Sequence, residues 1–418
     1  MAEIDQVIGL LDQTLPPVDI VKQEYTEWMQ CSPFLYDYLQ MWDMEYPVKN
    51  IQWILGVQQE NKKEYTTQKF YLSTRMANDS NDCIIQMSMH FPNSLVEVDL
   101  KHFNEEGATK SNTLGIDGRL TTEYRLYSPG EIIQMKHCPQ KDDLIATTSD
   151  AGGIFLFDLS HHPTSPINSE PHPQYHLNAH TGPCPGLDWS MARKECLASG
   201  GTDHAVCIWD VYSAAAVTLQ PTRVYAEQKG SVTAVAWHPH DSNILGVCGD
   251  DCNVIFYDTR EAHSVLFFQA HAQSVRSLVF NPVERFLFAT ACDDGTLSFW
   301  DQRATTKPLH SLAAHTGAAT GLAWSPFNAC ILASYGVDRR VNLWDISRVG
   351  AAKQSDRGFD EPEELLFVHG GHREAVSGVS WNPNDEWTIA SVAEDNSLQI
   401  WHPSHSILDA TETQGIAL

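Results

Sequence analysis

The sequence predicts an all-β protein in the form of a seven-bladed β-propeller, with an α-helix packed on its side. Three observations support this fold class. A pattern of His, Trp, Ser or Thr, Asp and Trp returns at fixed spacing along the chain of 418 residues. Apolar and polar residues alternate within each copy, as they do in half-buried strands. The first 44 residues have a helical pattern instead.

The repeated pattern is clearest between His315 and Asp345. A Trp follows the opening His by nine residues, a Ser precedes an Asp by four, and a second Trp lies six residues beyond that Asp. Because a repeat of this kind is the signature of propeller blades, four copies predict four blades. The copies are His180, Trp189, Ser199, Asp203 and Trp209; His271, Phe280, Thr290, Asp294 and Trp300; His315, Trp324, Ser334, Asp338 and Trp344; and His372, Trp381, Ser391, Asp395 and Trp401.

The chemistry of these residues favours a structural role over a catalytic one. An enzyme needs one active site, whereas this set of groups occurs four times. The pattern resembles that of the WD-repeat family, which implies a buried network of indole, hydroxyl, imidazole and carboxylate in each blade. A carboxylate is tolerated in such a place when hydrogen-bond donors surround it.

Three further regions complete the predicted ring. One degenerate copy ends at Ile255–Asp258 and another at Ile154–Asp158, each without the full network. Residues 48–120 lack the pattern, and we interpret them as a seventh blade. Whether their strands share a blade with the C-terminal ones, and so close the ring, stays open. The strand candidates in this region are Ile51–Val57, Lys69–Thr74, Cys83–Ser88 and Leu95–Leu100.

The N-terminal segment has two predicted helices. Pro16-Pro17 end the first, and Val21, Tyr25 and Trp28 form a stripe on the second that can pack against the propeller. Cys31-Ser32-Pro33 interrupts this second helix. The predicted domains are an N-terminal helical segment at 1–44, the propeller at 45–402 with an acidic insertion loop at 350–364, and a C-terminal tail at 403–418 with a short helix followed by disorder.

Composition limits the classes of partner. The chain has 53 acidic against 27 basic residues and a net charge of −26, which disfavours direct binding to nucleic acid or to a negatively charged membrane and favours basic partners such as histones. A net charge far from zero also simply keeps a protein in solution. The ten Cys residues are scattered without a CxxC pair, so we predict a reducing compartment, no metal site and no cofactor. No secretory signal or membrane helix is predicted.

Several segments carry a closer resemblance. They are Glu24–Leu39 (EYTEWMQCSPFLYDYL), Glu45-Tyr46-Pro47, Glu364–Trp381 (ELLFVHGGHREAVSGVSW) and Ala393–Trp401 (AEDNSLQIW). Over these segments the chain resembles the histone-binding WD-repeat proteins, which are the retinoblastoma-binding proteins and the small subunit of chromatin assembly factor. The resemblance implies a divergent, non-catalytic subunit of nucleosome-assembly, acetyltransferase, deacetylase, methyltransferase or remodelling complexes. It also implies histone partners, including the histone three/four dimer, and a place in the nucleus, with the cytoplasm left open.

The resemblance implies a binding site on the side of the propeller. There the N-terminal helix and the insertion loop hold the first helix of histone four. Arg357 stands where the family's loop has an acidic residue, although Asp356 is adjacent. The residues alone leave two alternatives open: a tolerated surface insertion, and ordinary packing for Leu35 and Phe367. The predicted contact residues are Phe34, Leu35, Asp356, Asp360, Glu363, Glu364, Leu366 and Phe367.

A second site of the family, an acidic pocket on the ring face that holds the tail of histone three, matches poorly. Glu45, Glu131 and Glu394 fit the family's pattern. Arg in such a pocket would repel an incoming Lys or Arg. We therefore predict that this face binds basic tails weakly or not at all. The other lining positions fall on Arg75, Ile133, Pro183, Pro185, Thr233, Arg276, Ala318 and Thr320.

One alternative function belongs to another class. Tyr257-Asp258-Thr259-Arg260 and Trp300-Asp301-Gln302-Arg303 resemble the WDxR box of substrate receptors for cullin ubiquitin ligases, although this motif is short and common among WD repeats. An enzyme is disfavoured because the sequence has no Gly-rich phosphate loop and no nucleophile motif.

Overall fold

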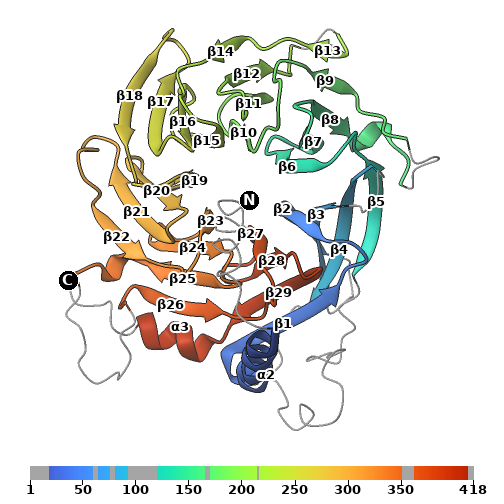
Figure 1. Cartoon of the computed structure of the whole chain (residues 1–418). Helices are drawn as coiled ribbons and strands as arrows, with labels where there is room; N and C mark the ends of the chain where they lie inside the picture. The colour runs from blue at the N-terminus through green and yellow to red at the C-terminus, as the bar shows by residue number, and fades with distance from the viewer. Residues whose placement is uncertain are drawn as a thin grey trace, which may run out of the picture.

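The computed structural model describes residues 18–59, 65–75, 81–92, 120–164, 170–213, 216–350 and 362–412. Within them, seven β-sheets surround a central channel, and helix α2 (Val18–Leu35) lies on the outer side of the ring (Figure 1). The predicted seven-bladed propeller with a helix on its side is confirmed. No helix in the described residues is long and apolar enough to cross a membrane.

Blades are numbered 1 to 7 in order around the ring, and each has its first-named strand nearest the channel. Blade 1 lacks the repeat, as predicted, but its fourth strand follows residue 120, while Leu95–Leu100 lies outside the described residues. Blade 1 contains β2 (Val48–Gln59), β3 (Tyr65–Thr74), β4 (Cys83–Pro92) and β5 (Thr121–Tyr127). Blade 2 contains β6 (Ile132–Cys138), β7 (Lys141–Ser149), β8 (Ile154–Asp158) and β9 (Tyr175–Leu177), with β13 (Thr218–Leu219) parallel to β9. Blade 3 contains β10 (Gly186–Trp189), β11 (Cys196–Gly200), β12 (Val206–Asp210) and β14 (Arg223–Tyr225).

Blades 4 to 6 each have four antiparallel strands. They are β15 (Val232–Trp237), β16 (Ile244–Gly249), β17 (Asn253–Asp258) and β18 (Ser264–Gln269); β19 (Val275–Phe280), β20 (Leu287–Cys292), β21 (Thr296–Asp301) and β22 (His310–Ala313); and β23 (Ala319–Trp324), β24 (Ile331–Gly336), β25 (Val341–Asp345) and β26 (Leu365–His369). In the described part of the chain, short 3-10 helices follow the third strand of two blades: η3 (Leu159–His161) after β8 and η4 (Ile346–Arg348) after β25.

Blade 7 closes the ring with strands from both ends of the chain. It contains β27 (Val376–Trp381), β28 (Ile389–Ala393), β29 (Ser397–Pro403) and, on its outer edge, β1 (Tyr36–Asp43), which pairs antiparallel with β29. The predicted helical segment at 1–44 is therefore wrong from Tyr36 onward. Tyr36 and Tyr38 are buried on one face of β1 at a spacing of two residues, and the open edge of β29 selects the strand over a helix. Residue 45 is thus not the start of the propeller.

The predicted interruption of the second helix is also wrong. Helix α2 continues through Pro33 to Leu35. Proline has no N–H to donate to the carbonyl four residues earlier, which here belongs to Met29. The hydroxyl of Ser32 donates to that carbonyl at 2.9 Å instead and replaces the missing hydrogen bond. After β29 the tail forms α3 (His405–Glu412), as predicted, and the rest of the tail lies outside the described residues.

The hydrophobic core lies between neighbouring blades. The first Trp of three repeats, on the innermost strand, donates its indole N–H to a backbone carbonyl of the preceding blade. Trp189 donates to Lys136 at 3.1 Å, and Trp381 donates to Ala323 at 2.9 Å. Trp324 donates to the preceding blade in the same way. The repeated indole therefore joins each of these blades to the one before it, which explains its fixed position in the pattern.

Candidate binding surfaces

Two of the repeated networks are closed by direct contact between His and Asp. His315 Nδ1 lies 2.9 Å from Asp338, and its Nε2 lies 2.7 Å from Ser334 Oγ, to which Trp344 Nε1 donates at 2.8 Å. The copy that begins at His180 has the same arrangement. Burial acts to raise the pKa of Asp338, but hydrogen bonds from the imidazole and a backbone N–H outweigh it and lower that pKa. The carboxylate therefore stays charged.

The other two networks insert a hydroxyl between His and Asp. Ser397 Oγ lies 2.8 Å from His372 Nδ1 and donates to Asp395 at 2.5 Å. In the copy that begins at His271, Thr296 takes the equivalent place. The sequence signal for this variant is a hydroxyl residue two positions after the Asp, which sequence reasoning missed. In all four copies the His ring is hydrogen-bonded to the hydroxyl that also accepts from the Trp indole, which supports a structural role.

Helix α2 is fixed to the propeller by a chain of polar aromatic contacts, here called the helix clamp: Trp28, Tyr36 and His369. Trp28 Nε1 donates to the Tyr36 hydroxyl at 3.1 Å, and that oxygen lies 2.7 Å from His369 Nδ1. The His369 ring stacks on Trp401 with ring centres 4.5 Å apart. Burial lowers the pKa of His369 well below its ordinary range, so the imidazole is neutral. The clamp thus joins α2 to blades 6 and 7.

Two further features bring α2 close to the blades. A Cβ on Gly371 would lie 2.3 Å from Gln399 Oε1 and 2.7 Å from the Trp28 ring, so only glycine allows this approach. Arg339 donates to Glu24 of α2 at 2.9 Å. Sequence reasoning predicted that Trp28 packs on the propeller, but it did not find His369 or Arg339, because these residues lie more than 300 positions from α2 in the chain.

Three apolar residues at the end of α2 and on β26 are here called the side stripe: Phe34, Leu35 and Leu366. Phe34 is 69% exposed, while Leu35 and Leu366 are half-buried and pack on the same core cluster. Phe367, which was also predicted as a contact, is only 5% exposed and packs edge-on against Tyr36. Its side chain therefore supports the stripe from beneath and offers little surface of its own.

The acidic part of the predicted side site is only partly described. Glu363 is half-buried, and Glu364 is buried with a carboxylate oxygen 3.2 Å from His310 Nε2. Asp356 and Asp360, together with Arg357, lie outside the described residues. Figure 1 shows α2, β26 and α3 on the same outer side of the ring, so the described part of the site is assembled from both ends of the chain.

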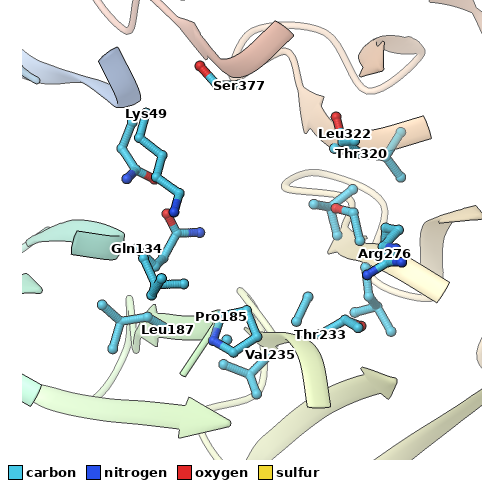
Figure 2. A pocket seen from close by; sticks show the side chains of 18 of the residues that line it. Lys49, Gln134, Pro185, Leu187, Thr233, Val235, Arg276, Thr320, Leu322 and Ser377 are labelled. Carbon is cyan, nitrogen blue, oxygen red and sulfur yellow. The ribbon is translucent and has the colours of Figure 1, made fainter. Parts of the chain in front are cut away.

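The ring face opens into a central cavity of about 980 Å³. Six of the eight positions that depart from the family's acidic pocket line this cavity: Arg75, Ile133, Pro185, Thr233, Arg276 and Thr320. Figure 2 shows Lys49 and Arg276 projecting toward the cavity from opposite sides. Lys49 and Arg75 each lie 3.3 Å from Glu131, so that carboxylate already has two cationic partners.

Arg276 is also paired with carboxylates of this face. Arg276 donates twice to Asp293, at 2.6 and 2.7 Å, and lies 3.8 Å from Asp250. These contacts raise the pKa of Arg276, which keeps the guanidinium charged. Glu45 and Glu394 are exposed at the surface. A basic peptide would therefore have to displace internal cations before it could use Glu131, Asp250 or Asp293, whereas Glu394 lines the cavity and is exposed.

Comparison with known families shows where the chain resembles other proteins. Residues 23–93 match the model of the histone-binding protein RBBP4 and its counterpart in the CAF1 complex. Residues 171–210 and 363–402 match the WD domain, G-beta repeat. Residues 212–344 also match the EIPR1 beta-propeller model, which agrees with the propeller found there. Together these matches support a divergent histone-binding WD-repeat protein. The match at 23–93 includes most of α2, all of β1 and the whole clamp except His369.

Proposed function

We propose that this protein is a non-catalytic histone-binding scaffold subunit of chromatin complexes in the nucleus, and that it binds the first helix of histone four between α2 and the insertion loop at 350–364. The family resemblance supports the partner class, because residues 23–93 match a histone-binding protein and include most of the helix that forms the proposed site. The net charge of −26 suits a basic partner.

The side stripe is the observation that carries this proposal. An amphipathic helix buries its apolar face in a groove and keeps its charged face at the rim. Phe34, Leu35 and Leu366 offer apolar surface, and the sequence that leads to Leu366 is rich in carboxylates, from Asp356 to Glu364. Lys and Arg of a bound helix would meet those carboxylates. The clamp beneath the stripe holds both of its edges in one rigid unit, which lowers the entropy lost on binding.

Binding of a fluorescent peptide of the first helix of histone four tests the proposal. Phe34→Ala removes exposed surface without opening the core, and we expect it to weaken binding by about 1–2 kcal/mol, roughly five- to thirtyfold. Asp360→Asn should also weaken binding, and the loss of affinity should be larger at low salt than at high salt. The matched control is Phe267→Ala, a half-exposed Phe on β18 in blade 4. Equal affinity of Phe34→Ala and Phe267→Ala would remove the side site.

The ring face should contribute little to histone binding in this protein. Its acidic groups at Glu131 and Asp293 are neutralised by Arg75, Lys49 and Arg276. We therefore propose weak or absent binding of the histone-three tail on this face. Isothermal titration with a tail peptide that gave tight binding would contradict this part of the proposal.

A substrate receptor for a cullin ubiquitin ligase is the second candidate function. Arg260 and Arg303 occupy equivalent places in blades 4 and 5, and each donates in bidentate fashion to the Asp two residues before it. Both side chains are about two-thirds exposed. Purification of the tagged full chain from nuclear extract separates the two functions. Histones with an assembly or acetyltransferase subunit support the first, and a cullin adaptor that is lost in Arg260→Ala/Arg303→Ala supports the second.

A further inference from the structure

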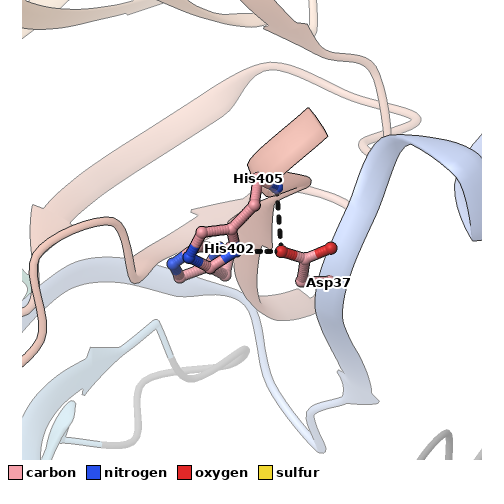
Figure 3. Close-up of side chains that lie close together, drawn as sticks. All are labelled: Asp37, His402 and His405. Atoms are coloured by element: carbon pink, nitrogen blue, oxygen red, sulfur yellow. Dashed lines mark hydrogen bonds and ion pairs between the residues drawn. The ribbon is translucent and has the colours of Figure 1, made fainter. Parts of the chain in front are cut away.

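Two histidines and a carboxylate meet where the two ends of the propeller chain join. Asp37 lies on β1, His402 lies near the end of β29, and His405 is the first residue of α3 (Figure 3). One donor atom from each of the three side chains lies within 4.8 Å of the other two. Asp37 and His405 are 368 residues apart in the sequence, so no spacing in the chain could indicate this cluster.

His402 is prepared to act as a metal ligand. It is buried, and its Nδ1 lies 2.6 Å from the carbonyl oxygen of Pro403. Because a carbonyl only accepts, Nδ1 must carry the proton, which leaves the lone pair on Nε2. Burial lowers the pKa of His402, so the neutral form that binds metals predominates. A backbone carbonyl bonded to the second ring nitrogen is the usual support for a metal-binding imidazole.

Asp37 and His405 already face each other. Asp37 Oδ2 accepts the backbone N–H of His405 at 2.8 Å and also contacts the imidazole Nδ1 of His405. Burial acts to raise the pKa of Asp37, but these contacts with His405 outweigh it and lower that pKa, so the carboxylate is charged. The His405 side chain is 58% exposed, which leaves its ring free to turn.

We propose that Asp37, His402 and His405 form a binding site for a divalent transition-metal ion, and that zinc is the ion it suits best. Two imidazoles and one carboxylate with an open fourth position are a ligand set that zinc accepts, with water as the fourth ligand. The bound ion would tie the first strand of the chain to the C-terminal helix at the point where the ring closes. This role is separate from histone binding and goes beyond the proposed function.

The geometry requires a small rearrangement on binding. Tetrahedral zinc holds its ligand atoms about 3.3 Å apart, which is closer than the 4.8 Å limit within which the three donors now lie. The two imidazole rings are nearly parallel, at 18°, with centres 5.0 Å apart. His405 must therefore turn its ring so that its lone pair converges with that of His402. Because metal ligands must be deprotonated, zinc binding should weaken as the pH falls.

The test measures zinc binding to the full chain by competition with a chromophoric chelator. We expect one strong site in the natural protein and at least roughly tenfold weaker binding in His405→Ala and in Asp37→Asn. His405 is exposed, so its loss should leave the propeller folded. The matched control is His263→Ala. His263 Nδ1 lies 2.9 Å from Glu227, which gives it the same imidazole–carboxylate pair without a second histidine.

Two further measurements make the outcome specific. Cobalt in place of zinc should give visible absorption bands that His402→Gln abolishes, and zinc should slow amide hydrogen exchange in α3. If one equivalent of zinc binds equally well to the natural protein, His405→Ala and His263→Ala, the ion binds elsewhere and the proposal is wrong. Absence of stoichiometric binding at neutral pH would also overturn it, and the cluster would then be an ion pair at the start of α3.

Discussion

The outer side and the ring face of this propeller are built on the same scaffold but differ in how their charges are used. On the ring face, Glu131 and Asp293 are held by internal cations. On the side, Phe34 offers exposed apolar surface, and the sequence that leads into β26 is rich in acidic residues. A carboxylate that already has an Arg partner gains little from a second cation, because the first must be displaced. The net acidity of a surface therefore does not show whether that surface binds basic partners. What matters is whether each carboxylate already has a cationic partner within the protein.

The two surfaces also differ in how they depend on the chain ends. The ring face is lined by the inner strands of the blades, each held by neighbours on both sides. The side depends on α2, which reaches the blades through the helix clamp and the Arg339–Glu24 pair. Damage to the clamp should therefore affect one surface and spare the other.

Of the variants proposed here, Trp28→Ala should have the largest effect: it should disrupt the outer side and leave the ring face unchanged. Losing a large aromatic side chain from a packed site costs about 3 kcal/mol or more, and here it also removes the hydrogen bond to Tyr36. We expect faster hydrogen exchange throughout α2 and loss of histone-four peptide binding, with exchange in β10 and β19 unchanged. The control is Tyr212→Ala, an exposed aromatic on blade 3. If α2 stayed protected in Trp28→Ala, the clamp would not be what holds it.

The double variant Arg75→Gln/Arg276→Gln should make the ring face bind basic ligands more tightly, as the side is proposed to do. Removing these cations takes the Arg276 partner from Asp293 and leaves Glu131 with Lys49 alone, so both carboxylates become more available to a basic ligand. We expect the tail of histone three to bind more tightly by about 1–2 kcal/mol, measured by isothermal titration at low salt. Arg260→Gln/Arg303→Gln removes two equivalent Arg–Asp pairs that belong to outer loops and serves as the control. An equal gain in both double variants would mean that net charge, and not pairing, governs binding.

The helix clamp on the outer side should also make the stability of the protein depend on pH. His369 is neutral when folded because burial lowers its pKa, whereas in the unfolded chain it takes up a proton near pH 6.5. Its contribution to stability is therefore present above that pH and is lost as the pH falls below it, by about 1 kcal/mol per pH unit. His372, which lies beside it and faces Asp395, has a pKa lowered by burial and acts in the same direction.

Denaturant unfolding between pH 7 and pH 5 measures this dependence. His369→Gln can still hydrogen-bond Tyr36 but cannot titrate, so its unfolding free energy should fall less steeply with acid than that of the natural protein. A His263→Gln variant, altered at an exposed site, should keep the natural slope. Identical slopes in all three proteins would show that His369 does not couple acid to stability.

The number of blades and the His, Ser or Thr, Asp and Trp of each network could be predicted from the amino-acid sequence, whereas the bridging hydroxyls of Ser397 and Thr296 were missed. Both follow from a local period, because His, Ser, Asp and Trp of one copy lie within about 30 residues and one blade satisfies them. The sequence also indicated the charge conflict on the ring face, since Arg75 and Arg276 are visible in it. It did not indicate that Glu131 and Asp293 would already be paired with them.

The junction of the chain ends, in contrast, depended on the folded ring. Tyr36–Asp43 became a strand because β29 offered an unpaired edge, and Phe367 became a support because Tyr36 and Trp401 covered it. Trp28 is linked to His369 through Tyr36, and Asp37 contacts His405. Each of these two links joins residues more than 300 positions apart in the sequence. A periodic pattern reports contacts within a repeat, but such long-range partners depend on ring closure, which brings the first and last strands together only when all seven blades have formed.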